Sequence, residues 1–213
     1  MTAMTAYAQT ERTQLAELLT ELGPDAPTLC GGWNTADLAA HLVVRDRRPD
    51  SGPGLLLSAF AGWTESVRRT ALDAEDYPAL VDKVAHPPWW SPISNPVIHE
   101  SVNLMEYFIH HEDVRRAQPD WQPRELPAEM ERILWRRLGV LRSMLRNVPA
   151  TVTLVAPRHG EVKAGRGGEA TVTITGTPSE LVLFCSGRQQ VAKVNLDGPE
   201  KIIERLRTAN FGL

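Results

Sequence analysis

The helical part of this chain is decided by residues 103–117, which read NLMEYFIHHEDVRRA. Glu106 and His110 are four residues apart, so both side chains leave one face of a helix, one turn apart. Asp113 is three residues beyond His110 and can accept the second imidazole N–H of that histidine. His111 lies about 100° further around the helix and is expected to meet solvent or a neighbouring helix. The pattern is consistent with a solvated charged face and with one side of a metal site.

A second candidate lies about seventy residues upstream, in residues 31–46, which read GGWNTADLAAHLVVRD. Asn34 or Thr35 can cap a helix that begins near Ala36. His41 falls beside the apolar stripe of that helix, so it should point toward the interior of a helix bundle or toward its edge. Taken alone, a buried histidine is more often a satisfied core residue than a metal ligand.

Two imidazoles and a carboxylate on partly buried faces need a compensating charge, because their desolvation is costly. A divalent ion held by His41, Glu106 and His110 supplies that charge and keeps a fourth position open for water or substrate. Zinc is the expected ion, and iron ranks lower because such iron sites usually lie on β-barrel strands. His99 shares the stripe of Glu106 but lies roughly 10 Å away. It is therefore either a substrate contact or a helix-capping or core-edge histidine.

Helical periodicity fills the first two thirds of the chain. Predicted helices cover residues 10–22, 36–48 and 55–72, a short segment before Pro87, residues 96–117, and a long segment after PRELPAEM at 123–130. Asn95 and Pro96 form the start signal of the helix that contains Glu106.

The pattern changes near Val148. Residues 150–157 and 170–176 alternate β-branched with small or polar residues, as half-buried strands do, and residues 159–170 between them supply turns. A short capped helix, a strand at 191–198 and a terminal helix follow. The sequence therefore predicts a mainly α protein, with a helical bundle over residues 1–147 and a small α+β module over residues 148–213.

The composition limits the function classes. The chain has 213 residues, a formal net charge of -3, 42% hydrophobic and 23% charged residues, which is typical of a globular protein without a nucleic-acid or anionic-membrane footprint. Neither a signal peptide nor a membrane span is recognisable, so a cytoplasmic protein is expected. Cys30 and Cys185 form no disulfide framework and are expected to be buried apolar residues.

Taken together, the two histidine-containing stretches resemble the actinobacterial branch of the DinB-like metal-binding bundles, and in particular the mycothiol-dependent maleylpyruvate isomerases. The residues that carry the resemblance are Gly32, Trp33, Asp37, His41 and Leu42 in the first stretch, and Glu106, His110, Asp113 and Val114 in the second. The resemblance implies a DinB-like four-helix bundle whose two histidines and glutamate bind a divalent metal, usually zinc, that activates a thiol cofactor. Residues 170–188 resemble part of a sterol-carrier-like C-terminal module.

We therefore expect a metal-dependent enzyme that activates a low-molecular-weight thiol, mycothiol by resemblance, for transfer to or isomerisation of a small electrophilic metabolite. Three alternatives stay open: a metal-dependent hydrolase of the same fold, a non-catalytic protein that binds metal and a small ligand, and an interaction module without chemistry. A fourth protein ligand such as His99 or His111 would favour the binding protein. No nucleophile elbow and no dinucleotide fingerprint points to a serine hydrolase or an NAD enzyme.

Overall fold

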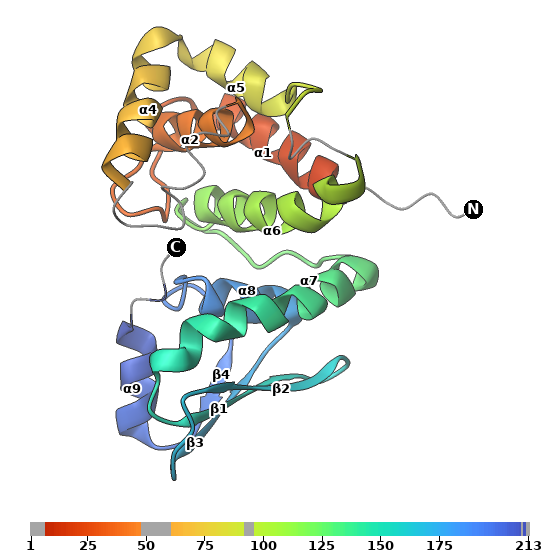
Figure 1. Ribbon diagram of the computed structural model, residues 1–213, viewed down its shortest axis with the longest axis vertical. Coiled ribbons are helices and arrows are strands. Elements are labelled where there is room, and N and C mark those ends of the chain that lie inside the picture. Colours follow the sequence, from red (N-terminus) through yellow and green to blue (C-terminus); the bar gives the residue numbers. More distant parts are fainter. Residues whose placement is uncertain (1–6, 48–60, 92–95, 210, 212–213) are drawn as a thin grey trace, which may run out of the picture. The chain divides into compact units, whose positions relative to one another are not determined.

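The structure is a computed structural model that describes residues 7–47, 61–91, 96–209 and 211, with the backbone alone for 61–64, 96–102 and 140 (Figure 1). The chain divides into two compact units, residues 1–122 and 123–213. The predicted fold class is confirmed: a mainly α chain in which a helical bundle is followed by a small α+β module. Within the described residues, no helix is both long enough and apolar enough to cross a membrane.

The first unit is built from helices. Those that the structure describes are α1 (Tyr7–Leu22), α2 (Thr35–Arg47), α4 (Ala61–Ala74), α5 (Tyr77–Ala85) and α6 (Pro96–Arg115). Helix α1 packs along α6 and against α5, while α2 packs against α4 and α5 (Figure 1). The expected start signal at Asn95 lies outside the described residues.

Helix α2, which carries His41, begins with a reciprocal cap. The backbone N–H of Asp37 donates to Oδ1 of Asn34 at 2.9 Å, and the N–H of Asn34 donates to Oδ2 of Asp37 at 3.1 Å. Two of the free N–H groups that a helix start exposes are satisfied in this way. This cap determines where α2 begins. It therefore also determines the position of His41 relative to the start of the helix.

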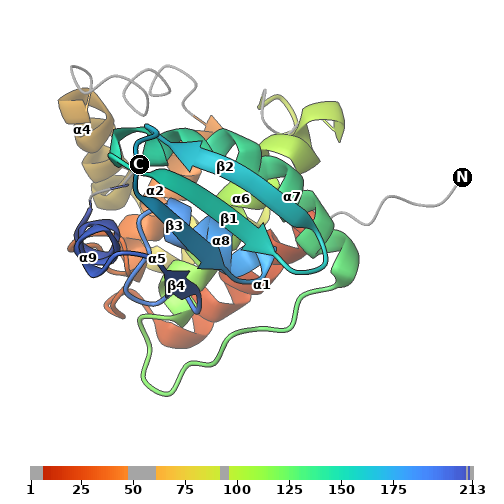
Figure 2. The ribbon, with the colours of Figure 1, turned by 90° about the horizontal axis from the view of Figure 1, so that it is seen from below.

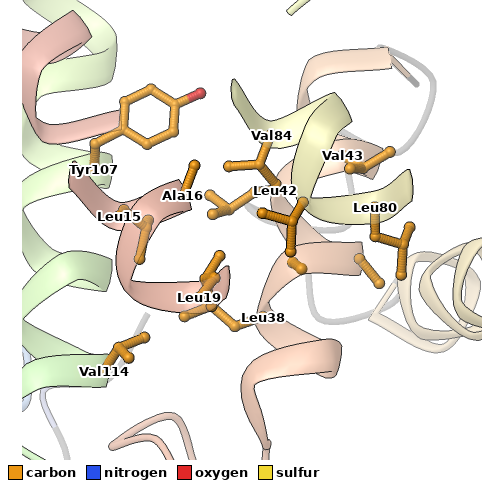
Figure 3. Packing of buried hydrophobic residues seen from close by; sticks show 13 residues of the cluster. Leu15, Ala16, Leu19, Leu38, Leu42, Val43, Leu80, Val84, Tyr107 and Val114 are labelled. Carbon is orange, nitrogen blue, oxygen red and sulfur yellow. The ribbon is translucent and has the colours of Figure 1, made fainter. Parts of the chain in front are cut away.

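The apolar core of the first unit joins the four helices α1, α2, α5 and α6 (Figure 3). Its labelled side chains are Leu15, Ala16 and Leu19 of α1, Leu38, Leu42 and Val43 of α2, Leu80 and Val84 of α5, and Tyr107 and Val114 of α6. Full burial of one such leucine or valine contributes about 1.5–3 kcal/mol. This packing holds α2 and α6 in the fixed relation on which the site depends.

Buried polar contacts also join α1 to its neighbours. Arg12 pairs with Asp46 of α2 at 3.2 Å and donates a hydrogen bond to the hydroxyl of Tyr107. Nδ1 of His111 lies 2.9 Å from Oε2 of Glu11. The expected neighbouring helix for His111 is therefore α1, and this histidine is buried.

The second unit contains three α-helices, one 3₁₀ helix and a four-stranded sheet among the described residues. The elements are α7 (Ala128–Leu141), the 3₁₀ helix η4 (Arg142–Asn147), β1 (Thr151–Ala156), β2 (Gly160–Gly165), β3 (Thr171–Thr175), α8 (Pro178–Cys185), β4 (Asn195–Asp197) and α9 (Glu200–Thr208). The strand order is β2-β1-β3-β4, with β1 parallel to β3 and the other pairs antiparallel. Helices α7 and α8 lie together on one face of the sheet (Figure 2).

Strand β2 corrects the expectation that residues 159–170 supply only turns. Residues 160–165 pair with β1, with Val162 opposite Leu154. The segment was not recognised as a strand because its side chains are mostly polar or small, which is typical of an exposed edge strand. Strand β4 covers only Asn195–Asp197 of the longer strand expected there.

The compact second unit begins at Pro123, well before the sequence pattern changes from helical to strand-like near Val148. Helix α7 packs on α8, and the buried residues Leu134 and Leu138 lie on α7. An amphipathic pattern predicts that one helix face is covered, but it does not identify the element that covers it. The assignment of residues 1–147 and 148–213 to two particular families of domain stays a prediction.

Candidate metal centre

The three expected ligands converge from two helices. Nε2 of His41 on α2 and Nε2 of His110 on α6 each lie 3.3 Å from Oε1 of Glu106. The three donor atoms all lie within 4.8 Å of one another. Two atoms bound to one tetrahedral zinc ion at about 2.05 Å lie roughly 3.3 Å apart, so the nitrogen–oxygen distances fit such an ion.

The donor groups are partly shielded from solvent. Side-chain exposure is 11% for His41, 12% for His110 and 25% for Glu106. The two imidazole rings have centroids 5.2 Å apart and meet edge to face, and the indole ring of Trp33 lies 5.3 Å from the ring of His41. Trp33 thus covers one side of His41, and the guanidinium of Arg68 lies 5.0 Å above the indole.

Asp113 takes the position expected of it. Its Oδ2 lies 3.0 Å from Nδ1 of His110, and its side chain is 0% exposed. Because an ionised carboxylate only accepts hydrogen bonds, His110 must donate from Nδ1. When the ring carries a single proton, the lone pair of Nε2 then faces Glu106 and His41, as a metal ligand requires.

Cys30 was missed as a site residue. Its Sγ lies 3.1 Å from Oδ2 of Asp113 and 3.6 Å from Nδ1 of His110. Among the described residues, Cys30, His110 and Asp113 form a second group of close donors, on the Nδ1 side of His110. No spacing signal could have found it, because Cys30 comes from the loop before α2. Cys185, in contrast, is 0% exposed, and its burial raises the pKa of its thiol to about 12.

Arg45 was also missed, although it lies four residues after His41 and so shares its helix face. Its Nε lies 3.4 Å from Oε1 of Glu106, and its Nη1 lies 2.8 Å from Oδ1 of Asn103. The side chain is 9% exposed. A permanent cation therefore stands beside the carboxylate that joins the two histidines.

Two further histidines, His111 and His99, were candidates for a fourth ligand or a substrate contact. His111 pairs with Glu11 of α1 and so is not placed as a fourth ligand. His99 belongs to α6, but its side chain lies outside the described part of the structure, so its expected contact with substrate stays a prediction.

The environment separates the pKa values of the three donors. Burial alone would raise the pKa of Glu106, but the hydrogen bonds with His110 and His41 and the charge of Arg45 hold this pKa well below its ordinary range. Burial lowers the pKa of His41. Burial also opposes a charge on His110, yet hydrogen bonds with Asp113, Cys30 and Glu106 raise its pKa well above the ordinary value. In the absence of metal, these contacts therefore favour a proton on His110 beside the Glu106 carboxylate.

The fold and this geometry define a class: a helical-bundle protein in which two histidines and one carboxylate lie close enough to hold a metal ion. Residues 8–51 match the family model of the mycothiol maleylpyruvate isomerase N-terminal domain. The match covers α1 from its second residue onward and includes His41, and it supports a mycothiol-related family. Glu106, His110 and the second unit lie outside it, so a sterol-carrier-like module stays a prediction. No curated protein and no solved structure matches the chain.

Proposed function

We propose that this chain is a metal-dependent enzyme that activates a low-molecular-weight thiol, with mycothiol expected, and adds it to a small electrophilic metabolite. His41, Glu106 and His110 would hold the divalent ion, with zinc expected. The observation that carries the proposal is the convergence of the three donor atoms within 4.8 Å of one another. Two of them are separated by 65 positions in the chain.

Bound zinc would lower the pKa of a coordinated thiol and so supply the thiolate near neutral pH. The three protein donors leave one tetrahedral position for that thiol. Asp113 keeps a proton on Nδ1 of His110, so that Nε2 is the nitrogen that would bind the ion once its own proton has left. The indole ring of Trp33 packs beside the ring of His41, with their centroids 5.3 Å apart.

The thiolate forms one carbon–sulfur bond to an electrophilic carbon of a carbon–carbon double bond, and the π bond breaks as its electron pair moves to the neighbouring carbon. If the thiol leaves after rotation about the former double bond, the product is an isomer. If the adduct takes up a proton instead, the product is a thiol conjugate. The same donor set would serve a metal-dependent hydrolase or a non-catalytic binding protein, and we favour the thiol because the matching family model is named for mycothiol.

Metal content of the purified full chain tests the ion site. We expect about one zinc per chain, lost in His41→Ala and in His110→Ala. The matched control is His111→Ala. His111 lies on the same helix as His110, but its imidazole pairs with Glu11 and not with the proposed ion site. This control should lower stability and keep the ion. Absence of any divalent ion from the wild type, with no rise in melting temperature on adding zinc, would refute the site.

Thiol activation has its own test. Mycothiol added to the cobalt-substituted protein should produce an intense sulfur-to-cobalt absorption band. If the cobalt protein forms and the band does not appear, the ion site stands and thiol activation is refuted. Consumption of a panel of unsaturated small electrophiles in the presence of mycothiol then separates the enzyme from the binding protein.

A further inference from the structure

The loop that carries Cys30 is fixed by its own hydrogen bonds. Thr28 Oγ1 donates to the carbonyl of Trp33 at 2.8 Å and accepts from the N–H of Cys30 at 3.2 Å. The N–H of Leu29 donates to the carbonyl of Asp113 on α6 at 3.1 Å. The backbone of Cys30 is therefore tied to the same turn of α6 that carries the Asp113 carboxylate.

The thiol of Cys30 and the imidazole of His110 share one acceptor. Oδ2 of Asp113 lies 3.1 Å from Sγ of Cys30 and 3.0 Å from Nδ1 of His110. A carboxylate accepts, so the thiol must donate its S–H and the imidazole its Nδ1–H. Hydrogen bonds to an ionised acceptor are stronger than neutral ones, which partly offsets the weakness of a thiol as a donor.

We propose that Cys30 is a positioning residue of the metal centre, which acts on His110 through Asp113. Its thiol holds the Asp113 carboxylate in the orientation that receives Nδ1–H of His110, and this aims Nε2 of His110 at the ion. The inference rests on the proposed function, because it concerns the same ion. Cys30 is not among the proposed ligands, and the family match assigns no role to it.

Direct ligation by Cys30 fits the distances less well. Bonds of about 2.3 Å to sulfur and 2.1 Å to oxygen on one tetrahedral zinc ion separate the two atoms by roughly 3.6 Å. The observed separation of 3.1 Å between Sγ and the Asp113 oxygen is that of a hydrogen bond. The sulfur also lies on the Nδ1 side of His110, whereas Glu106 and His41 lie on the Nε2 side.

The test compares zinc affinity, by competition with a chromogenic chelator, and the ligand-field spectrum of the cobalt protein. Removal of contacts that orient a metal-binding histidine costs 10–100-fold in metal affinity, and for Cys30→Ala we expect about 10-fold with a shifted cobalt spectrum. Cys30→Ser keeps a hydroxyl donor and should recover most of both. Cys185→Ala removes the buried thiol of the second unit and should leave affinity and spectrum unchanged.

A double-mutant cycle tests the route through Asp113. In the Asp113→Ala background, Cys30→Ala should cause no further loss of zinc affinity. If Asp113→Ala does not fold, Asp113→Asn takes its place in the cycle. Additive losses would show that Cys30 acts by another route and would overturn the inference.

Two further results would overturn it. One is a Cys30→Ala protein with wild-type zinc affinity and cobalt spectrum. The other is an intense thiolate band in the cobalt protein before any thiol is added, abolished by Cys30→Ser, which would make Cys30 a ligand. A wild-type protein that binds no ion refutes the proposed function and this inference together, whereas ion binding that is indifferent to Cys30→Ala refutes the inference alone.

Discussion

Nε of Arg45 lies 3.4 Å from Oε1 of Glu106, so the carboxylate between the two histidines has a cationic neighbour before any ion arrives. The same guanidinium donates from Nη1 to Asn103 at 2.8 Å. A divalent ion bound at the proposed site would therefore share Glu106 with the permanent positive charge of Arg45. Arg45 stabilises the metal-free site and moderates its affinity for a cation.

This relationship predicts the behaviour of Arg45→Met, which keeps an apolar stem and removes the charge. We expect the metal-free protein to lose about 1–3 kcal/mol, less than for a fully buried pair because Glu106 is one-quarter exposed. Zinc should raise the melting temperature by more in the variant than in the wild type, because the ion replaces the missing charge. Thermal denaturation with and without zinc measures both effects.

The matched control for this change is Arg69→Met. Arg69 pairs with Glu65 at 2.7 Å but is 72% exposed. Loss of such a surface pair changes stability by no more than about 0.5 kcal/mol. Equal effects of the two substitutions would contradict the role given to Arg45.

A second prediction concerns pH. The pKa of His110 is raised in the metal-free protein, so the stability gained from its proton is fully present below the ordinary histidine value and is lost as pH rises through the raised pKa. Zinc bound as proposed would have to displace this proton from His110. Zinc affinity should therefore increase with pH through that window and level off above it.

Calorimetry at pH 7 in two buffers with different ionisation enthalpies measures the proton release, and we expect about one proton per zinc. Asp113→Asn weakens one of the hydrogen bonds that raise the pKa of His110, so this variant should release fewer protons. Binding heats that are the same in both buffers for the wild type would count against the prediction.

The buried pair between α1 and α2 leads to a third prediction. Asp46 is 1% exposed and faces Arg12, which is 3% exposed, at 3.2 Å. Asp46→Ala leaves the guanidinium in the interior without its carboxylate, which costs about 3–5 kcal/mol. Urea denaturation measures this loss of stability. The control is Glu129→Ala, which removes an exposed pair with Arg132 and should leave the denaturation curve unchanged. A small effect of Asp46→Ala would mean that Arg12 finds another partner.

Two glycines of the second unit should respond in opposite directions. Gly165 has φ +83°, and an added Cβ would lie 2.3 Å from the carbonyl oxygen of Ala150, so Gly165→Ala should cost about 2 kcal/mol or more. Gly139 lies within α7 with nothing within 4 Å of an added Cβ. Gly139→Ala should therefore stabilise the protein by about 0.5–1 kcal/mol. Urea denaturation measures the stability of both variants. Changes in the same direction would refute the prediction that the two substitutions have opposite effects.

Much of the first unit was predictable from local rules. The cap predicted at Asn34 or Thr35 placed the start of α2 within one residue of its observed position at Thr35, and periodicity placed the end of α6 within two residues of Arg115. The spacing of Glu106 and His110 on one helix face needed no knowledge of the rest of the chain. These features depend on neighbours within one or two helical turns, which a sequence displays directly.

The missed features depend on distant partners. Cys30 meets Asp113 across 83 positions, from a loop whose path has no periodicity. Helix α7 shows an apolar stripe, but the stripe is equally compatible with a bundle and with the face of a sheet. Strand β2 is polar and lies at an edge, so it lacks the alternation by which a half-buried strand is recognised.

The donors His41 and Glu106 are 65 positions apart, so an ion held by both closes a long loop of the chain. Such an ion acts as a removable cross-link between α2 and α6. Chains without it would open more often and offer proteases more unfolded segments. The lifetime of this protein in vivo would then follow the supply of the metal, and its abundance would fall under zinc starvation even where its synthesis is unchanged.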